Sequence, residues 1–156
     1  VVEVLDHPAS DKAPFGQAVR ARSESGGGWL GWVVRVDDIT QVERRLGRKA
    51  VQGNRHRPDG VELRWRQIGV QGLQTDPQLP FFVEWEVPDH LHPSAGATGD
   101  VALSRLAIAG DPTRVAGWLD TPSDHTLGDY EVAWVTGRAP GLAAATFATP
   151  DGPVSV

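Results

Sequence analysis

Residues 34–46 read VRVDDITQVERRL, and this stretch decides the fold because a second copy of it follows later in the chain. The copy is residues 107–119, AIAGDPTRVAGWL, at a constant offset of 73 residues. In each copy an apolar strand ends at an aspartate, a residue type that commonly caps a following helix. The offset aligns four pairs: Asp38 with Asp111, Thr40 with Thr113, Val42 with Val115 and Leu46 with Leu119. Internal repetition of this kind predicts a repeated structural unit.

Three strand-like segments punctuated by glycine follow each copy. The first set is KAVQGN, GVELRWRQIGV and LPFFVEWEV, and the second set is YEVAWVTG, GLAAATFAT and GPVSV. The repeated unit is therefore a strand, a helix and three strands. We expect helices at about residues 12–24, 39–46 and 112–119, with ends uncertain by about two to four residues.

A second echo indicates how the units are arranged. VEVLDHPAS at residues 2–10 resembles VEWEVPDHLHPS at residues 83–94, so the chain is expected to begin with the end of another unit. The expected fold class is α+β, with tandem βαβββ modules forming curved mixed sheets backed by short helices. The expected organisation is residues 1–25 as the tail of a first module with a connecting helix, 26–95 as a complete module, and 96–156 as a degenerate module packed on it.

The composition excludes several classes of function. The net charge of −5 argues against nucleic acid as a partner, because binding to phosphates needs an excess of lysine and arginine. The chain has no cysteine, which excludes disulfides, thiolate zinc sites and a cysteine nucleophile. No apolar run is long enough to cross a membrane, and no signal peptide is visible. We therefore expect a cytoplasmic protein, and the bias toward arginine, alanine and glycine suggests a bacterial source.

The tandem βαβββ pattern resembles the vicinal oxygen chelate superfamily, which includes glyoxalase I, extradiol dioxygenases and bleomycin-resistance proteins. Three strings in particular are similar to its glyoxalase-like domain proteins: GGGWLGWVVRVDDI, RPDGVELRWRQIG and LPFFVEWE followed by HP. The resemblance is strong for residues 26–94 and weaker beyond residue 100. It implies that the opening elements of a first module are absent from this sequence.

The resemblance also implies where a metal would bind. Metal-dependent relatives place a histidine on the first strand of a module and a glutamate on its last strand. Glu3 and Glu84 match the glutamate position, whereas Gly31 and Arg105 stand at the histidine position and cannot replace imidazole. We therefore expect no cofactor and no tightly bound transition metal. If a divalent metal does bind, the candidate ligands are Glu3, Glu84, His7 and His92.

Alternation along the strands suggests a ligand site instead. Phe82, Glu84 and Glu86 share one face of their strand, and Glu62, Arg64 and Arg66 share one face of the neighbouring strand. The opposite, more apolar faces are expected to pack on the helices. The polar faces would then form a concave cup in which arginines pair with glutamates, as buried charges require. The predicted site has Glu84 as catalytic residue or ligand anchor, with Arg64, Arg66, Trp29 and Arg35 around it.

Each of these residues also has a structural interpretation. Glu84 could form only a salt bridge across the sheet, and the two interpretations stay open with about even odds. Arg57, in the segment NRHRPDG, is a candidate ligand-binding residue on a loop over the cup. The same segment is also typical of a solvated hairpin, since Pro-Asp-Gly is a turn signal.

Three hypotheses for the function remain open. The first is a glyoxalase-like protein that binds a small anionic or aromatic molecule in the cup, with lyase or isomerase chemistry as its enzymatic form. The second is a non-catalytic sequestering protein of the bleomycin-resistance type. The third is a fragment whose activity needs the missing module. The expected partners are a small-molecule ligand and, left open, a second copy of the chain in a homodimer.

Overall fold

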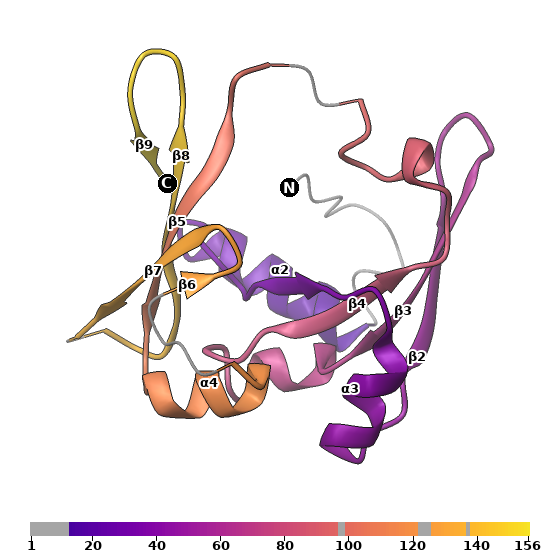
Figure 1. Cartoon of the computed structure of the whole chain (residues 1–156), viewed down its shortest axis with the longest axis horizontal. Coiled ribbons are helices and arrows are strands. Elements are labelled where there is room, and N and C mark those ends of the chain that lie inside the picture. Colours follow the sequence, from indigo (N-terminus) through magenta and orange to yellow (C-terminus); the bar gives the residue numbers. More distant parts are fainter. Residues whose placement is uncertain (1–12, 97–98, 122–125, 137) are drawn as a thin grey trace.

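The computed structural model describes residues 13–96, 99–121, 126–136 and 138–156 (Figure 1). Up to residue 96 the described elements are α2 (Pro14–Glu24), β1 (Val33–Arg35), α3 (Ile39–Leu46), β2 (Val51–His56), β3 (Glu62–Ile68), the 3-10 helix η1 (Val70–Gln74), β4 (Phe81–Trp85) and the 3-10 helix η2 (Asp89–Leu91). The later described elements are β5 (Ala102–Ala109), α4 (Pro112–Leu119), β6 (Thr126–Leu127), β7 (Tyr130–Val135), β8 (Gly141–Ala148) and β9 (Val154–Ser155). The three predicted helices correspond to α2, α3 and α4.

The first four strands form a mixed sheet in the order β1-β4-β3-β2. Strand β1 runs parallel to β4, with Val34 opposite Phe82, and β3 is antiparallel to both β4 and β2. Parallel neighbours need a long crossover connection, which α3, β2 and β3 provide here. The elements β1 to β4 together with α3 therefore have the predicted βαβββ arrangement.

The second sheet has a different strand order, β6-β7-β5-β8-β9. Strand β5 runs parallel to β7 on one side and antiparallel to β8 on the other, and β9 pairs with β8 at the edge. The equivalent strand of the first sheet, β1, is an edge strand. The α+β class with two mixed sheets is confirmed. The second module keeps the strand-helix start of the repeat but distributes its later strands on both sides of β5.

The ends of the two repeat helices are built alike. The Asp38 carboxylate accepts a hydrogen bond from the Thr40 amide at 2.9 Å, and Asp111 accepts one from the Thr113 amide at 2.9 Å. Both predicted caps are therefore confirmed. At the other end, Gly47 after α3 and Asp120 after α4 adopt the left-handed conformation, with φ of 62° and 58°.

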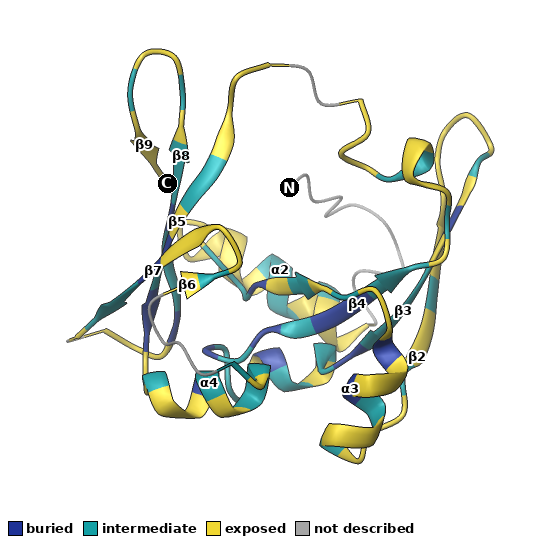
Figure 2. Cartoon of the chain, in the orientation of Figure 1, coloured by how far each residue is buried: buried dark blue, intermediate teal, exposed yellow. Residues whose placement is uncertain are grey.

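Among the described residues, two clusters of buried residues form the core. Figure 2 colours the buried positions dark blue along the ribbon. One belongs mainly to the second sheet and comprises Trp32, Leu106, Ile108, Val115, Val132 and Ala145. The other lies beneath α3 and comprises Ile39, Val42, Ile68 and Phe82. Val34 and Leu119 pack against both clusters, so the two modules share a continuous apolar interior. Helix α2 buries none of its residues, and none of the helices in the described ranges has the length and hydrophobicity to cross a membrane.

A seam around Trp118 joins α4 to the first module. The indole Nε1 of Trp118 donates a hydrogen bond to the Pro80 carbonyl at 2.8 Å, and Arg45 Nη1 donates one to the Trp118 carbonyl at 2.6 Å. The Arg48 guanidinium lies 5.1 Å from the centre of the Trp118 ring, and the Phe82 ring lies 6.0 Å from it. These contacts fix how the two modules sit against each other.

Candidate functional site

The sheet face that carries Glu84 packs against helix α3. Ile68 and Phe82 stand opposite each other on this face, each about 2% exposed, and both contact the buried side of α3. The prediction that this face forms an open cup away from the helices is therefore wrong. The reason is that β3 and β4 bury apolar residues on both faces, since Leu63 and Val83 on the opposite face are 1% and 7% exposed. Where a sheet is buried on both faces, as at Phe82 and Val83, alternation does not identify a polar face.

Glu84 belongs to a polar clamp that holds both ends of α3. Its Oε2 accepts a hydrogen bond from the Ile39 amide at 2.7 Å, at the start of the helix. The same oxygen lies 3.9 Å from Arg66 Nη1, and Arg66 Nη2 lies 3.4 Å from Glu43 Oε2. Glu43 in turn accepts a hydrogen bond from the Ala50 amide at 2.8 Å, just beyond the helix. The clamp, defined as Glu84, Arg66 and Glu43, connects α3 to β3, β4 and the start of β2.

The other predicted ligand-binding residues lie apart from this pair. Trp29 lines a hollow with Phe15 and other residues beside α2. Arg57 lies in the β2–β3 hairpin, 2.7 Å from the Asp59 carboxylate, and Arg64 is exposed on β3. Arg35 stands at the rim of a cleft that is described below. The structure therefore brings Glu84 and Arg66 together and leaves the rest of the predicted set in separate places.

The described positions that match the metal ligands of relatives, Gly31, Arg105 and Glu84, do not fit a metal site. Gly31 offers no donor, and a Cβ atom added there would collide with the Leu73 side chain. Arg105 lies 3.4 Å from the Glu131 carboxylate in an exposed pair. Glu84 is already bound by the start of α3.

The other candidate metal ligands add nothing to these positions. His92 packs edge-on against Trp85, with ring centres 5.1 Å apart, and its Nδ1 lies 2.7 Å from the Ser94 hydroxyl. Glu3 and His7 lie outside the described residues. Within the described residues, no group of three or more histidine, aspartate or glutamate side chains could hold a metal ion.

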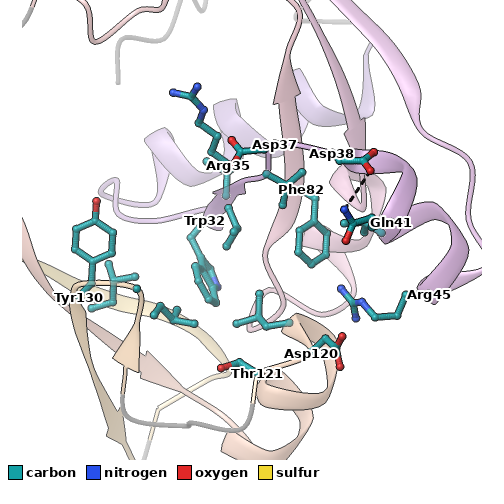
Figure 3. Close-up of a pocket in the computed structure, with 18 of the residues that line it drawn as sticks. Trp32, Arg35, Asp37, Asp38, Gln41, Arg45, Phe82, Asp120, Thr121 and Tyr130 are labelled. Atoms are coloured by element: carbon teal, nitrogen blue, oxygen red, sulfur yellow. Dashed lines mark hydrogen bonds between the residues drawn. The ribbon is translucent and has the colours of Figure 1, made fainter. Parts of the chain in front are cut away.

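A cleft with a volume of about 1300 Å³ lies between the two modules (Figure 3). One wall comes from β1, the segment after it and α3, and the other comes from β5, the β6–β7 turn and the end of α4. Sites for small molecules usually measure about 300 to 1,000 Å³, so this intermodule cleft has room for such a ligand and for solvent.

The floor of the cleft is apolar and firmly held. It is formed by side chains from both modules: Trp32, Phe82, Leu103, Leu106 and Leu119. Trp32 is only 7% exposed, and its Nε1 donates a hydrogen bond to the Gln78 carbonyl at 3.0 Å. Phe82 belongs to the core under α3. Because these rings are fixed by packing, a ligand would not have to order them.

The rim of the cleft is polar. Tyr130, 42% exposed, stands at one end, and charged residues of both signs surround the opening: Arg35, Asp37, Asp38, Arg44, Arg45 and Asp120. Hydrogen bonds from the Gln41 side chain and from Thr40 hold the pKa of Asp38 below its ordinary value. Asp38 therefore stays ionised as the cap of α3.

Comparison with known proteins agrees with this architecture. A family described as glyoxalase-like domain matches residues 1–123 of the sequence. The chain belongs to the glyoxalase-like domain family. A crystal structure of a hypothetical protein from Staphylococcus aureus has the same fold, with a TM-score of 0.60 and 15% identity. The match covers 85% of this glyoxalase-like chain and 64% of that protein, so the chain spans less than two thirds of its length. No functionally curated protein matches the sequence significantly.

Sequence reasoning missed the cleft of this glyoxalase-like protein. Trp32, Tyr130 and Asp120 come from distant parts of the chain, and alternation within one sheet cannot bring them together. The segment VRVDDI contained one indication of the cleft. Two aspartates, Asp37 and Asp38, follow the strand, although the helix needs only one of them as its cap. The surplus residue, Asp37, lies at the cleft.

Proposed function

We propose that the protein binds a small molecule with an aromatic ring in the intermodule cleft. The observation that carries the proposal is the aromatic lining of the cleft: Trp32 and Phe82, 7% and 2% exposed, form part of a fixed apolar floor, and Tyr130, 42% exposed, is the most open of the three rings. Offset or edge-to-face contacts with such rings favour an aromatic ligand by about 0.5 to 1.5 kcal/mol each beyond area burial. Tyr130 at the rim adds a third ring that a bound ligand would contact.

The proposed function is one of binding, of the sequestering type. Glu84 is not part of it, since its carboxylate is engaged by Ile39 and Arg66 and it does not line the cleft. The glyoxalase-like family supports a small-molecule site without naming its ligand. The binding experiment does not depend on whether the bound molecule is also turned over by lyase or isomerase chemistry.

Nuclear magnetic resonance with indole as a probe tests this proposal. Each tryptophan side chain gives its own Nε1–H signal in a ¹⁵N-labelled protein. Millimolar indole is expected to shift the Trp32 signal and the Tyr130 amide, and to leave the signals of Trp65 and Trp85 unchanged because they lie on the far face of the first sheet. Shifts confined to Trp65 and Trp85, or no shifts at all, would contradict the proposal.

A matched pair of variants controls for nonspecific effects. Val33 lines the cleft and is 47% exposed, whereas Val51 on β2 is 62% exposed and lies outside the cleft. Val33→Trp is expected to fill part of the cleft and abolish the indole-induced shifts, and Val51→Trp is expected to leave them intact. Equal binding by both variants would place the indole elsewhere.

A further inference from the structure

Three arginines among the described residues line the cleft, and each has a polar partner in the protein. Arg35 lies 3.3 Å from the Asp89 carboxylate, and Arg44 donates to the Thr40 carbonyl at 3.4 Å. Arg45 donates to the Trp118 carbonyl, and its guanidinium lies 5.7 Å from the centre of the Phe82 ring. Each of these guanidinium groups therefore has a polar partner in the protein, and that partner is a carboxylate only for Arg35.

Three aspartates among the described residues line the cleft, and the carboxylates of two of them have no polar partner. Asp38 caps α3, but the side-chain carboxylates of Asp37 and Asp120 form no hydrogen bond or ion pair with any of the residues that the structure describes. Asp37 comes from the wall of the first module and Asp120 from the wall of the second (Figure 3). Two carboxylates without a partner among the described residues thus stand on opposite walls of the cleft.

The backbone conformation at Asp120 supports a role for its carboxylate. Asp120 is the one non-glycine residue with a positive φ among the described residues. The left-handed conformation favours glycine, and glycine is the residue at the equivalent position after α3, Gly47, 73 residues earlier. At the end of α4 the chain instead carries a side chain, and that side chain lines the cleft.

We infer that the ligand of the intermodule cleft is an aromatic cation, such as an arylalkylammonium compound. This inference rests on the proposed function and adds the charge of the ligand to it. The ring lies on the apolar floor to which Trp32 and Phe82 belong, and the ammonium group is attracted by Asp37 and Asp120. A cation beside the exposed face of Tyr130 gains a further attraction to the ring, worth about two- to fivefold in affinity at such sites.

Three indole probes of similar shape test the charge. Tryptamine carries an ammonium group at pH 7, indole-3-acetate carries a carboxylate, and 3-methylindole is neutral. Titration at low salt is expected to show that tryptamine binds about tenfold more tightly than indole-3-acetate, since two carboxylates and a ring each favour the cation by up to about fivefold. The difference is expected to shrink in 0.5 M sodium chloride, because exposed charges are screened by salt.

The outcomes separate the two proposals. If none of the three probes binds, the proposed function fails. If all three bind equally, or if indole-3-acetate binds most tightly, the cleft still binds aromatic molecules and the inference about charge is wrong.

Variants locate the charge. Asp37→Asn and Asp120→Asn are each expected to weaken tryptamine binding by about three- to fivefold and to leave the binding of 3-methylindole unchanged. Asp120→Gly is expected to weaken tryptamine binding equally while its melting temperature stays the same or rises, because glycine suits the left-handed backbone. Asp151→Asn, in the β8–β9 turn outside the cleft, makes the same charge change and is expected to bind tryptamine normally. Unchanged tryptamine affinity in both the Asp37 and the Asp120 variants would overturn the inference.

Discussion

Replacing Glu84 by alanine removes the acceptor at the start of α3 and the charge that faces Arg66. The 2.7 Å hydrogen bond from the Ile39 amide is charge-assisted and is worth about 1.5 to 3 kcal/mol. The Arg66 contact at 3.9 Å is partly exposed, with 28% and 24% of the two side chains accessible, and adds at most about 0.5 kcal/mol. We therefore expect Glu84→Ala to lower the free energy of unfolding by about 2 to 3 kcal/mol.

Thermal and urea unfolding measure this loss. For a chain of this size, 1 kcal/mol corresponds to about 2 to 4 °C in melting temperature, so the expected decrease is about 4 to 12 °C. Glu84→Gln keeps an oxygen acceptor for Ile39 but loses the charge, and it is expected to cost only about 1 kcal/mol. Neither variant is expected to change the affinity for indole, since Glu84 does not line the cleft.

Two results would refute this reasoning. An unchanged melting temperature for Glu84→Ala would mean that the clamp does not hold α3. A large loss of indole binding by Glu84→Gln with normal stability would mean that Glu84 takes part in ligand binding. Glu62→Gln is a suitable control because Glu62 is an exposed carboxylate on the face of β3 that also carries Arg66, and it lies far from the start of α3.

Further predictions concern other parts of the protein. The pKa of Asp38 is lowered by folding, so its contribution to stability is present above its unfolded pKa and is lost as the pH falls below about 4. Between pH 6 and pH 2, the urea midpoint of Asp38→Asn is expected to fall less steeply than that of the unsubstituted protein. Equal slopes for the two proteins would contradict this prediction. Ile108 is 0% exposed, and Ile108→Ala is expected to lower the unfolding free energy by about 2 to 5 kcal/mol, against less than about 1.5 for Ile108→Val. Gly110 has a φ of 141°, and a Cβ there would collide with the Gln78 side chain, so Gly110→Ala is expected to destabilise the fold more than Gly96→Ala, where the added atom meets nothing. Protein purified without chelators is expected to contain less than stoichiometric zinc, iron or nickel by elemental analysis, and its melting temperature is expected not to respond to chelator.

The helices and their caps could be predicted from sequence because the signals are local. The repeat at an offset of 73 placed α3 and α4 correctly, and Asp38 and Asp111 cap them as expected. An aspartate cap needs only its own amide neighbours, so no distant residue can override it. The same offset says nothing about strand partners, which depend on contacts between distant segments.

The ligand site and the second sheet could not be predicted, because both depend on contacts between distant segments of the chain. Alternation correctly grouped Phe82 with Glu84 and Arg64 with Arg66, but it could not say which face the helix covers. Strand β8 pairs with β5 in the second sheet, and no signal in GLAAATFAT distinguishes that edge from the one beside β7. The cleft depends on both of these features, since its walls come from different modules.

Arg45 and Trp118 occupy the same position in the two repeat helices, 73 residues apart, and they touch each other. When two identical units pair about a two-fold axis, a residue near that axis meets its own copy. Two first modules paired in this way would bring Arg45 against Arg45 and oppose like charges, whereas here the guanidinium meets a carbonyl. The divergence of this one position therefore favours pairing of unlike modules within a chain. If two chains exchange modules, each first module has to find a second module, because pairing of two first modules is disfavoured.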